Sequence, residues 1–259
     1  MSHLQVEKLS IAFGGVHAIE ELSFDIRAAT IHSIIGPNGA GKTTLFNMIT
    51  GLYRPDSGRI LFEEEEVTAR PPHLLARKGL SRTFQNLQIF FRMTALENVM
   101  VGRHLHEPKN PVAQLLRLPA MTRAERACRE RARELLNFVG LAEHAEAEAG
   151  GLPYGALKRL EIARALAAEP KMLLLDEPAA GCNPAETKEI DGLIQKVAAQ
   201  GVTVVLVEHD MHLVMNISDH ILVLDYGRKL AEGTAAEVRA NPEVIAAYLG
   251  AEGAEHAQG

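Results

Sequence analysis

Cysteine is scarce in this chain of 259 residues, which contains only Cys128 and Cys182. The two cysteines lack the C-x-x-C spacing of cysteine-based zinc sites, so the sequence argues against a structural zinc ion. Such low cysteine usage also fits a reducing compartment, because secreted domains of small size are commonly held by disulfides.

Long apolar runs are missing as well. None approaches the roughly 20 residues that a helix needs to cross a bilayer, and residues 1–7 lack the charged and apolar regions of a secretion signal. We therefore expect any attachment to a membrane to come through a partner protein.

The chain also lacks a surplus of positive charge. Lysine and arginine together number 27 and aspartate and glutamate 33, which gives a net charge of −6. This balance disfavours a protein that binds phosphate backbones broadly, so no nucleic-acid partner is expected. The length suits one two-lobed domain with a sizeable core.

A glycine-rich segment that fits G-x-x-x-x-G-K-[ST] follows the apolar stretch Ile31–Ile35. It consists of Gly36, Pro37, Asn38, Gly39, Ala40, Gly41, Lys42, Thr43 and Thr44. The apolar stretch predicts a buried strand, and residues 43–50 predict a helix that ends at Gly51. Loop and helix start would then aim backbone N–H groups at a phosphate, with Lys42 adding charge and Thr43 a hydroxyl for Mg²⁺. The segment predicts a nucleoside triphosphate site.

Two adjacent carboxylates, Asp176 and Glu177, end a second apolar stretch that begins at Lys171. Strand alternation sends them in different directions. Asp176 can hold the Mg²⁺ shell while Glu177 faces the γ-phosphate and polarises water. The alternative is that the pair only caps the following turn.

Three other regions have recognisable patterns. Leu4–Phe13, Leu22–Ile26 and Arg59–Phe62 predict an antiparallel sheet beside the phosphate loop. The middle, from about residue 87, contains Pro108, Pro111 and Pro119 and then an amphipathic helix over Arg123–Val139. Strands and helices alternate in the remainder, which favours a mainly parallel sheet. The run Glu63–Glu66 predicts a solvated hairpin tip, with a cation site as the alternative.

With these motifs in this order, the chain resembles the ATP-binding subunit of an ABC transporter over nearly its full length. The resemblance identifies Phe13 as the aromatic residue that stacks on adenine, Gln85 as the Q-loop glutamine and His209 as the switch histidine. Each residue alone has a simpler explanation, and Val16 could cover the base instead of Phe13. The implied fold is α/β, with a P-loop ATPase core of mainly parallel sheet, an antiparallel β subdomain and an α-helical subdomain.

The resemblance also implies a layout and a mechanism. Residues 1–250 would form one ABC ATPase domain, with the helical subdomain at about 87–165, and 251–259 a mobile tail. Glu177, His209 and Gln85 would be catalytic, and Gln85 would join Thr43 and Asp176 at Mg²⁺. ATP and Mg²⁺ are the implied cofactors.

Four stretches narrow the resemblance toward importers of branched-chain and other hydrophobic amino acids. They are residues 13–15, residues 81–86 followed by 93–99, residues 179–184 and residues 241–250. The implied partners are transmembrane permease subunits, a second ABC ATPase subunit, identical or homologous, and indirectly a solute-binding protein. The chain would then lie at the cytoplasmic face of the inner membrane, attached through the permease.

The signature segment departs from the family pattern Leu-Ser-(Gly or Tyr)-Gly-Gln, because Pro153 and Ala156 replace its serine and glutamine. By resemblance, Tyr154 and Gly155 would contact the ATP of the facing subunit. Pro153 removes a hydroxyl and an N–H, which could cost on the order of 1–3 kcal/mol of phosphate stabilisation. It could equally just rigidify the helix start.

Two alternatives to an amino-acid importer motor therefore stay open. One is a weakly hydrolytic, nucleotide-gated subunit of a related importer, such as one for urea or amides. The other is a soluble, non-transport ABC ATPase, which would usually carry two fused ATPase domains or a long coiled-coil insertion.

Overall fold

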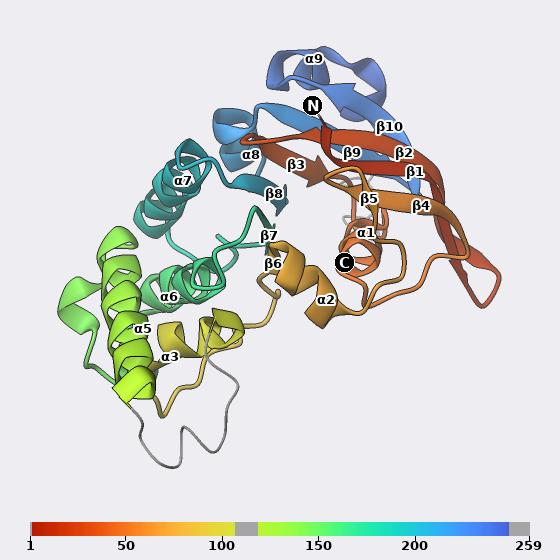
Figure 1. The fold of residues 1–259 in the computed structure, drawn as a ribbon. Coiled ribbons are helices and arrows are strands. Elements are labelled where there is room, and N and C mark those ends of the chain that lie inside the picture. Colours follow the sequence, from red (N-terminus) through yellow and green to blue (C-terminus); the bar gives the residue numbers. More distant parts are fainter. Residues whose placement is uncertain (1, 107–118, 249–259) are drawn as a thin grey trace.

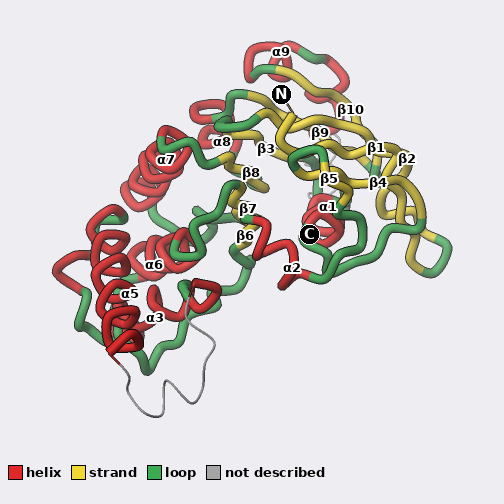
Figure 2. The backbone as a smooth tube through the Cα atoms, in the orientation of Figure 1, coloured by secondary structure: helices red, strands yellow, loops and turns green. Residues whose placement is uncertain are grey.

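Residues 2–106 and 119–248 are described by the computed structural model, in which the strands gather on one side and most helices on the other (Figures 1 and 2). The sequence-based expectations for Pro108, Pro111 and the tail at 251–259 lie outside the described residues. No described helix is long and apolar enough to cross a membrane.

An antiparallel sheet of order β2-β1-β4-β5 covers one side of the molecule. Its strands are β1 Ser2–Phe13, β2 Val16–Arg27, β4 Ser57–Phe62 and β5 Glu65–Glu66. The predicted sheet is confirmed, although β2 begins six residues before the expected Leu22. A tight turn at Gly14 and Gly15, both at positive φ, joins β1 directly to β2 and lets the pairing continue to Phe13 and Val16.

The acidic run forms the predicted hairpin tip between β4 and β5. Glu63 and Glu64 occupy left-handed conformations with φ of 49° and 65°. Basic side chains neutralise this tip, since Lys171 Nζ lies 2.6 Å from Glu63 Oε2 and Arg70 Nη2 lies 2.8 Å from Glu65 Oε1. These ion pairs argue against the alternative of a cation site.

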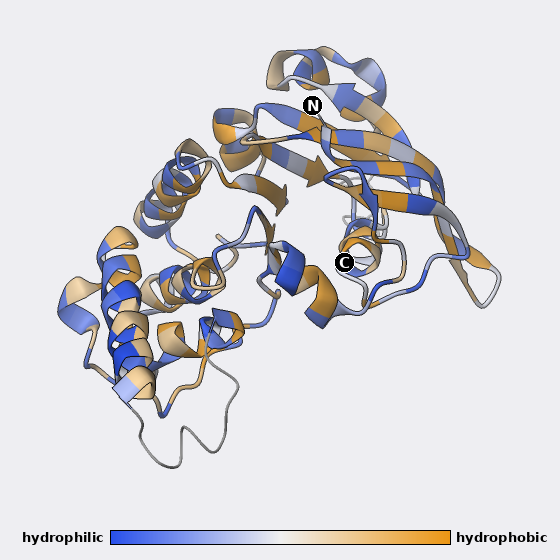
Figure 3. Cartoon of the chain, viewed as in Figure 1, coloured by the Kyte–Doolittle hydropathy of each residue, from blue (hydrophilic) through white to orange (hydrophobic). Residues whose placement is uncertain are grey.

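A second sheet has the order β10-β9-β3-β8-β7-β6 and is parallel except for the edge strand β10, as expected for a mainly parallel sheet. Its strands are β3 Ile31–Ile35, β6 Leu80–Arg82, β7 Met172–Asp176, β8 Thr203–Val207, β9 His220–Asp225 and β10 Arg228–Gly233. Every residue of β3, β7 and β8 is buried, which explains why these strands are mostly apolar in sequence (Figure 3).

The described α-helices are α1 Lys42–Ile49, α2 Pro72–Lys78, α3 Ala95–Gly102, α5 Pro119–Phe138, α6 Tyr154–Leu166, α7 Pro184–Ala199, α8 Met211–Ile217 and α9 Ala235–Ala240. Short 3-10 turns occur at His104–His106, Ala142–His144 and Ala149–Gly151. Helix α5 includes Pro119, the first described residue after residue 106, and so extends four residues before the predicted Arg123. A capping box of Thr234 and Glu237 opens α9.

Two large apolar cores and one small one lie against the parallel sheet in the described part of the chain, and the two large ones position the site. One encloses the buried side of α1 between the two sheets, so that Leu45 and Phe46 of α1 pack with residues of both. The other joins α3, α5 and α6 to α7 and to the opposite face of the parallel sheet. The predicted apolar stripe on α5 contributes Ala132, Leu135 and Leu136 to this second core. The phosphate loop is thus anchored on a helix that is packed from both sides.

Candidate functional site

Four neighbouring strands deliver the predicted site residues to one edge of the parallel sheet. In the order β3-β8-β7-β6, these strands are followed by the phosphate loop at Gly36, by His209, by Glu177 and by Gln85. Parallel strands end at the same edge, and ligands of open α/β sheets bind at this carboxyl edge. Residues far apart in the sequence therefore meet because of strand order.

The phosphate loop depends on glycine at Gly41, which has a φ of 98°. A Cβ atom there would lie 2.5 Å from the carbonyl oxygen of Ala18 on β2, so no other residue fits without movement. Gly39 also has positive φ (81°), but the space around it is open. Asn38 and Gly39 are exposed at the tip, whereas Ala40 is buried. The loop is thus packed at its base and accessible at its tip.

Lys42 folds back over the loop that it follows. Its Nζ donates to the carbonyl oxygens of Gly36 and Pro37, at 2.6 and 3.0 Å. Burial lowers the pKa of Lys42, and the negative charges of Glu177 and Asp176 oppose that shift. The ammonium group is therefore held beside the loop, while Thr43 is exposed and Thr44 half-buried in the first turn of α1.

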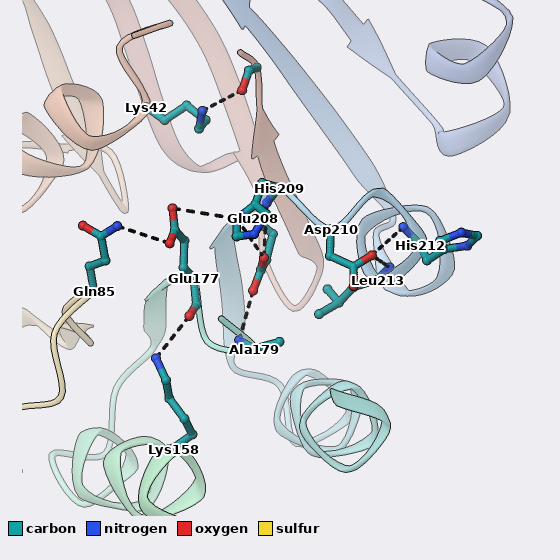
Figure 4. A network of polar contacts seen from close by, with 11 residues as sticks. Lys42, Gln85, Lys158, Glu177, Ala179, Glu208, His209, Asp210, His212 and Leu213 are labelled. Atoms are coloured by element: carbon teal, nitrogen blue, oxygen red, sulfur yellow. Dashed lines mark hydrogen bonds and ion pairs between the residues drawn. The ribbon is translucent and has the colours of Figure 1, made fainter. Parts of the chain in front are cut away.

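Glu177 is the meeting point of the predicted catalytic residues (Figure 4). Its Oε2 accepts a hydrogen bond from Gln85 Nε2 at 3.2 Å, and its Oε1 lies 3.9 Å from His209 Nδ1. The side chain of Glu177 is 23% exposed and that of His209 is 66% exposed. The structure thus brings together the three residues named as catalytic, with solvent access for a water molecule.

Lys158 is a residue of this site that the sequence analysis did not identify. The side chain is buried, and its Nζ donates to the backbone carbonyl of Glu177 at 3.3 Å (Figure 4). Glu177 is also in the left-handed region, with a φ of 49°, which is strained for a side chain of this kind. The lysine stabilises that unusual backbone and so helps to fix the direction of the carboxylate.

Glu208 is a second residue that was missed. It is 2% exposed, and its two oxygens accept from the backbone N–H groups of Ala179 at 3.0 Å and His209 at 3.2 Å. Burial raises the pKa of Glu208, although these hydrogen bonds partly offset the effect. A charged residue among apolar ones at the end of β8 was the available signal.

Asp176 differs from its neighbour, because it is buried and paired with Arg82. Arg82 Nη2 lies 2.7 Å from Asp176 Oδ2, and Arg82 Nη1 donates to Asn47 Oδ1 on α1. In the described part of the chain, no residue donates to the second oxygen, Oδ1. One carboxylate oxygen of Asp176 is thus held by Arg82, and the other accepts no hydrogen bond from the described residues.

Phe13 lies away from this cluster, at the end of β1. It is 47% exposed, and its ring contacts Tyr53 edge to face with 5.4 Å between centroids. Val16, the alternative cover for a base, is 70% exposed on the other side of the turn. Phe13 is therefore a largely exposed aromatic ring that packs against Tyr53, rather than part of the core.

The signature residues also lie outside the cluster, at the start of α6. Pro153 precedes the helix, Tyr154 is 42% exposed, and Gly155 is buried. The N–H of Gly155 is already used, since it donates to Glu186 Oε1 at 3.2 Å. A carboxylate from α7 thus occupies the helix N-terminus that the sequence analysis expected to attract phosphate.

Comparison with known proteins shows to which family this chain belongs. The family model "ABC transporter" matches residues 19–180, which include the phosphate loop, Gln85, the signature segment and Glu177. The chain belongs to the ABC transporter family. A second model, "Branched-chain amino acid ATP-binding cassette transporter", matches residues 228–254.

Curated relatives of this ABC transporter subunit match it over nearly their whole length. It is 49% identical to the high-affinity branched-chain amino acid transport ATP-binding protein BraF of Pseudomonas aeruginosa, over 95% of this chain and 97% of that protein. It is 47% and 45% identical to the LivG proteins of Salmonella typhimurium and Escherichia coli K12, with the same coverage. The predicted resemblance is confirmed.

Solved structures agree with the fold. An ATP-binding cassette in its ADP conformation superposes with a TM-score of 0.85 at 35% identity, covering 96% of this chain and 99% of that one. A nucleotide-free cassette gives a TM-score of 0.84 at 34% identity, covering the same shares. The predicted α/β ABC ATPase fold is therefore confirmed, and the chain is an ATP-binding, ATP-hydrolysing subunit of the transporter family.

Proposed function

We propose that this subunit hydrolyses ATP to power a membrane importer for branched-chain or other hydrophobic amino acids. The observation that carries the enzymatic part is the convergence of the phosphate loop, Gln85, Glu177 and His209 at the ends of four neighbouring strands. The choice of solute follows the names of the relatives, which are described as transporting branched-chain amino acids. The solute itself would not contact this chain.

Mg²⁺ is the cation that the oxygen donors of the site suit. The hydroxyl of Thr43, the free Oδ1 of Asp176 and the amide oxygen of Gln85 are hard ligands of the kind Mg²⁺ prefers. Asp176 Oδ2 stays on Arg82, which holds the carboxylate in place. When bound, Mg²⁺ neutralises charge on the phosphate oxygens.

The chain's own residues supply the remaining functions. Backbone N–H groups of the phosphate loop and the ammonium of Lys42 bind the phosphates, and Lys42 must exchange its two loop carbonyls for phosphate oxygens. Glu177 orients water and accepts its proton, while His209 stabilises the phosphate and the water. Phe13 supplies a ring face for adenine.

A complete site requires a second ATPase subunit in this proposal, because Tyr154 and Gly155 lie at the start of α6 and would contact the ATP of the facing subunit. Two such subunits would close on ATP and open after hydrolysis, moving permease subunits that receive solute from a binding protein. The chain would be held through the permease at the cytoplasmic face of the membrane.

The test is ATP hydrolysis by the complex purified with its membrane partners. Turnover should rise when the cognate solute-binding protein is loaded with leucine, isoleucine or valine, and urea and acetamide serve as solute controls. If only urea raises ATP turnover, the transported solute is urea rather than a branched-chain amino acid. Absence of hydrolysis in the assembled complex would instead favour the nucleotide-gated alternative.

A further inference from the structure

Three side chains of types that can bind a metal ion lie on three adjacent strands, at the edge of the parallel sheet. His32 is the second residue of β3 and is paired in register with His220, the first residue of β9. Glu232 follows on β10, which pairs with β9 in antiparallel fashion. Strand pairing therefore brings together two imidazoles and a carboxylate that are up to 200 residues apart (Figure 1).

The ligand atoms are close enough for one ion to bind all three residues after small adjustments. A ring nitrogen of each histidine and a carboxylate oxygen of Glu232 all lie within 4.8 Å of one another. His220 Nε2 and Glu232 Oε1 are 3.2 Å apart, and the rings of His32 and His220 meet edge to face at 4.9 Å. In the described part of the chain, this is the one group of three such residues with this spacing.

His32 provides an independent sign that the cluster has a ligand. Its side chain is 1% exposed, and its Nε2 is buried without a hydrogen-bond partner among the described residues. A buried polar atom without a partner is costly, by about 1–3 kcal/mol. Packing against Phe24 alone does not satisfy the ring nitrogen of His32. A bound ion would satisfy it, because the nitrogen could then act as a ligand.

The other two residues leave an entry path. The side chains of His220 and Glu232 are 32% and 22% exposed. Lys229 Nζ contacts the other oxygen, Glu232 Oε2, at 2.7 Å and orients the carboxylate, although its charge also opposes a cation. The arrangement is thus half-open, with one buried ligand and two near solvent.

We propose that His32, His220 and Glu232 bind one divalent transition-metal ion, best matched by Zn²⁺. Two imidazole nitrogens and one carboxylate oxygen are ligands that Zn²⁺ accepts, with water completing a tetrahedral set. The absence of a C-x-x-C pair does not exclude such a site, because its ligands are histidine and glutamate rather than cysteine. The bound ion would tie β3, β9 and β10 together and stabilise this edge of the sheet.

The site is separate from the ATP site. His32 is four residues before Gly36, so the two ends of β3 are about 13 Å apart at the usual rise of a strand. Zn²⁺ binding should therefore occur without nucleotide, and ATP with Mg²⁺ should not compete with it.

The experiment measures Zn²⁺ binding by titration calorimetry on the tag-free chain, after chelator treatment and removal of the chelator. We expect one Zn²⁺ per chain, a higher unfolding temperature with Zn²⁺, and visible absorption bands of tetrahedral Co²⁺ when Co²⁺ replaces it. His220→Gln and Glu232→Gln should each weaken Zn²⁺ binding by about tenfold or more. His17→Gln, which changes an exposed histidine on β2, should bind as the wild type does.

His32→Val tests the buried ligand in a strand where valine fits, and the two partly exposed variants carry the test if it does not fold. Folding of every variant is checked by circular dichroism. The proposal is overturned if the wild-type chain takes up no stoichiometric Zn²⁺, or if His220→Gln and Glu232→Gln bind it normally. Loss of binding in His209→Gln alone would also overturn it, since the ion would then lie at the ATP site.

Discussion

Arg82 and Asp176 form a buried ion pair in which Nη2 and Oδ2 are 2.7 Å apart and the side chains are 7% and 4% exposed. The same guanidinium donates to Asn47 Oδ1 on α1 at 2.6 Å and to Thr50 Oγ1, at the C-terminal cap of α1, at 3.2 Å. Its planar group also lies 5.2 Å from the ring centre of Phe84, one residue before Gln85. One side chain thus links α1, β7 and the start of the segment that carries Gln85.

Arg82→Met should therefore destabilise the fold more than an ordinary surface change. Removing one partner leaves Asp176 buried and uncompensated, which typically costs about 3–5 kcal/mol. Urea unfolding measures the loss. Arg82→Lys keeps the positive charge but lacks the paired N–H donors of the guanidinium. Its free energy of unfolding should lie between those of Arg82→Met and the wild type.

A double-mutant cycle separates the ion pair from the other contacts of Arg82. Asp176→Asn combined with Arg82→Met should recover part of the lost stability, because no unpaired charge remains. Strictly additive losses would mean that Asn47, Thr50 and the aromatic rings, rather than Asp176, account for the role of Arg82.

Glu177→Gln should reduce hydrolysis by about 10²-fold or more while leaving ATP affinity largely intact, because an amide keeps the shape but cannot accept a proton. Gln85 can still donate to the side-chain oxygen of the new glutamine, and Lys158 can still donate to the backbone carbonyl of residue 177. Both contacts should therefore keep the new side chain in place. Single-turnover hydrolysis and retention of ATP are measured together. Near-normal hydrolysis would remove Glu177 from the role of base.

Phe13→Ala should weaken ATP binding by about 1–3 kcal/mol, the usual worth of a base stack. Tripolyphosphate binding should be unchanged, since it requires only the phosphate loop. Tyr53→Ala is the matched variant, because Tyr53 only supports the edge of the Phe13 ring. Equal loss of both ligands in Phe13→Ala would show that Phe13 acts through the fold.

Glu208→Gln should change stability in a pH-dependent way. Burial raises the pKa of Glu208 above its ordinary 4.5, so the folded state favours the protonated carboxyl. That contribution is fully present below 4.5 and is lost as the pH rises through the raised folded value. The glutamine variant should gain stability relative to wild type between pH 4.5 and neutrality, on top of a constant loss of one backbone acceptor. Parallel urea curves at all pH values would contradict this.

Much of the fold was predictable because buried parallel strands have a plain sequence pattern. Ile31–Ile35 was predicted and found as β3, since both faces of the strand are covered and every residue is apolar or buried. The edge strand β10, with the sequence Arg-Lys-Leu-Ala-Glu-Gly, was not predicted. It is half-exposed and held by pairing with β9, so its own residues give little signal.

The site was predictable in part for a similar reason. The phosphate loop needs glycines at fixed positions because of its backbone dihedrals, and Asp176 and Glu177 are two adjacent charges after an apolar strand. Both patterns are local and can be seen in the sequence. Lys158, Arg82 and Glu208 act through contacts between distant segments, and only the order of the strands brings those segments together. Of these three, only Glu208 has a local signal, as a charged residue directly after the apolar strand β8. The contacts themselves cannot be predicted from sequence spacing.

The signature helix gives the last prediction, which concerns the carboxylate at its start. Glu186 accepts from Gly155 N at 3.2 Å and from Asn183 N at 2.9 Å, so it serves both α6 and the capping box of α7. A phosphate of the facing subunit would meet this negative charge. Glu186→Gln should remove the repulsion and raise hydrolysis at the facing site about twofold to fivefold, as expected for 0.3–1 kcal/mol at a helix end.

The measurement requires an assembled complex in which this chain also carries Glu177→Gln, so that the remaining turnover belongs to the facing site. Glu189→Gln, three residues further along α7, is the matched control: its exposed carboxylate pairs with Arg159 of α6 rather than with the helix start, so hydrolysis should not change. Pro153→Ser restores the missing hydroxyl at an exposed position and should add to the effect, because only contacts that strengthen in the transition state speed the reaction. Ala156 is 4% exposed, so a glutamine there would be overpacked and is a poorer choice. If neither Glu186→Gln nor Pro153→Ser changes turnover at the facing site, the start of α6 does not limit hydrolysis and Pro153 is a structural variant.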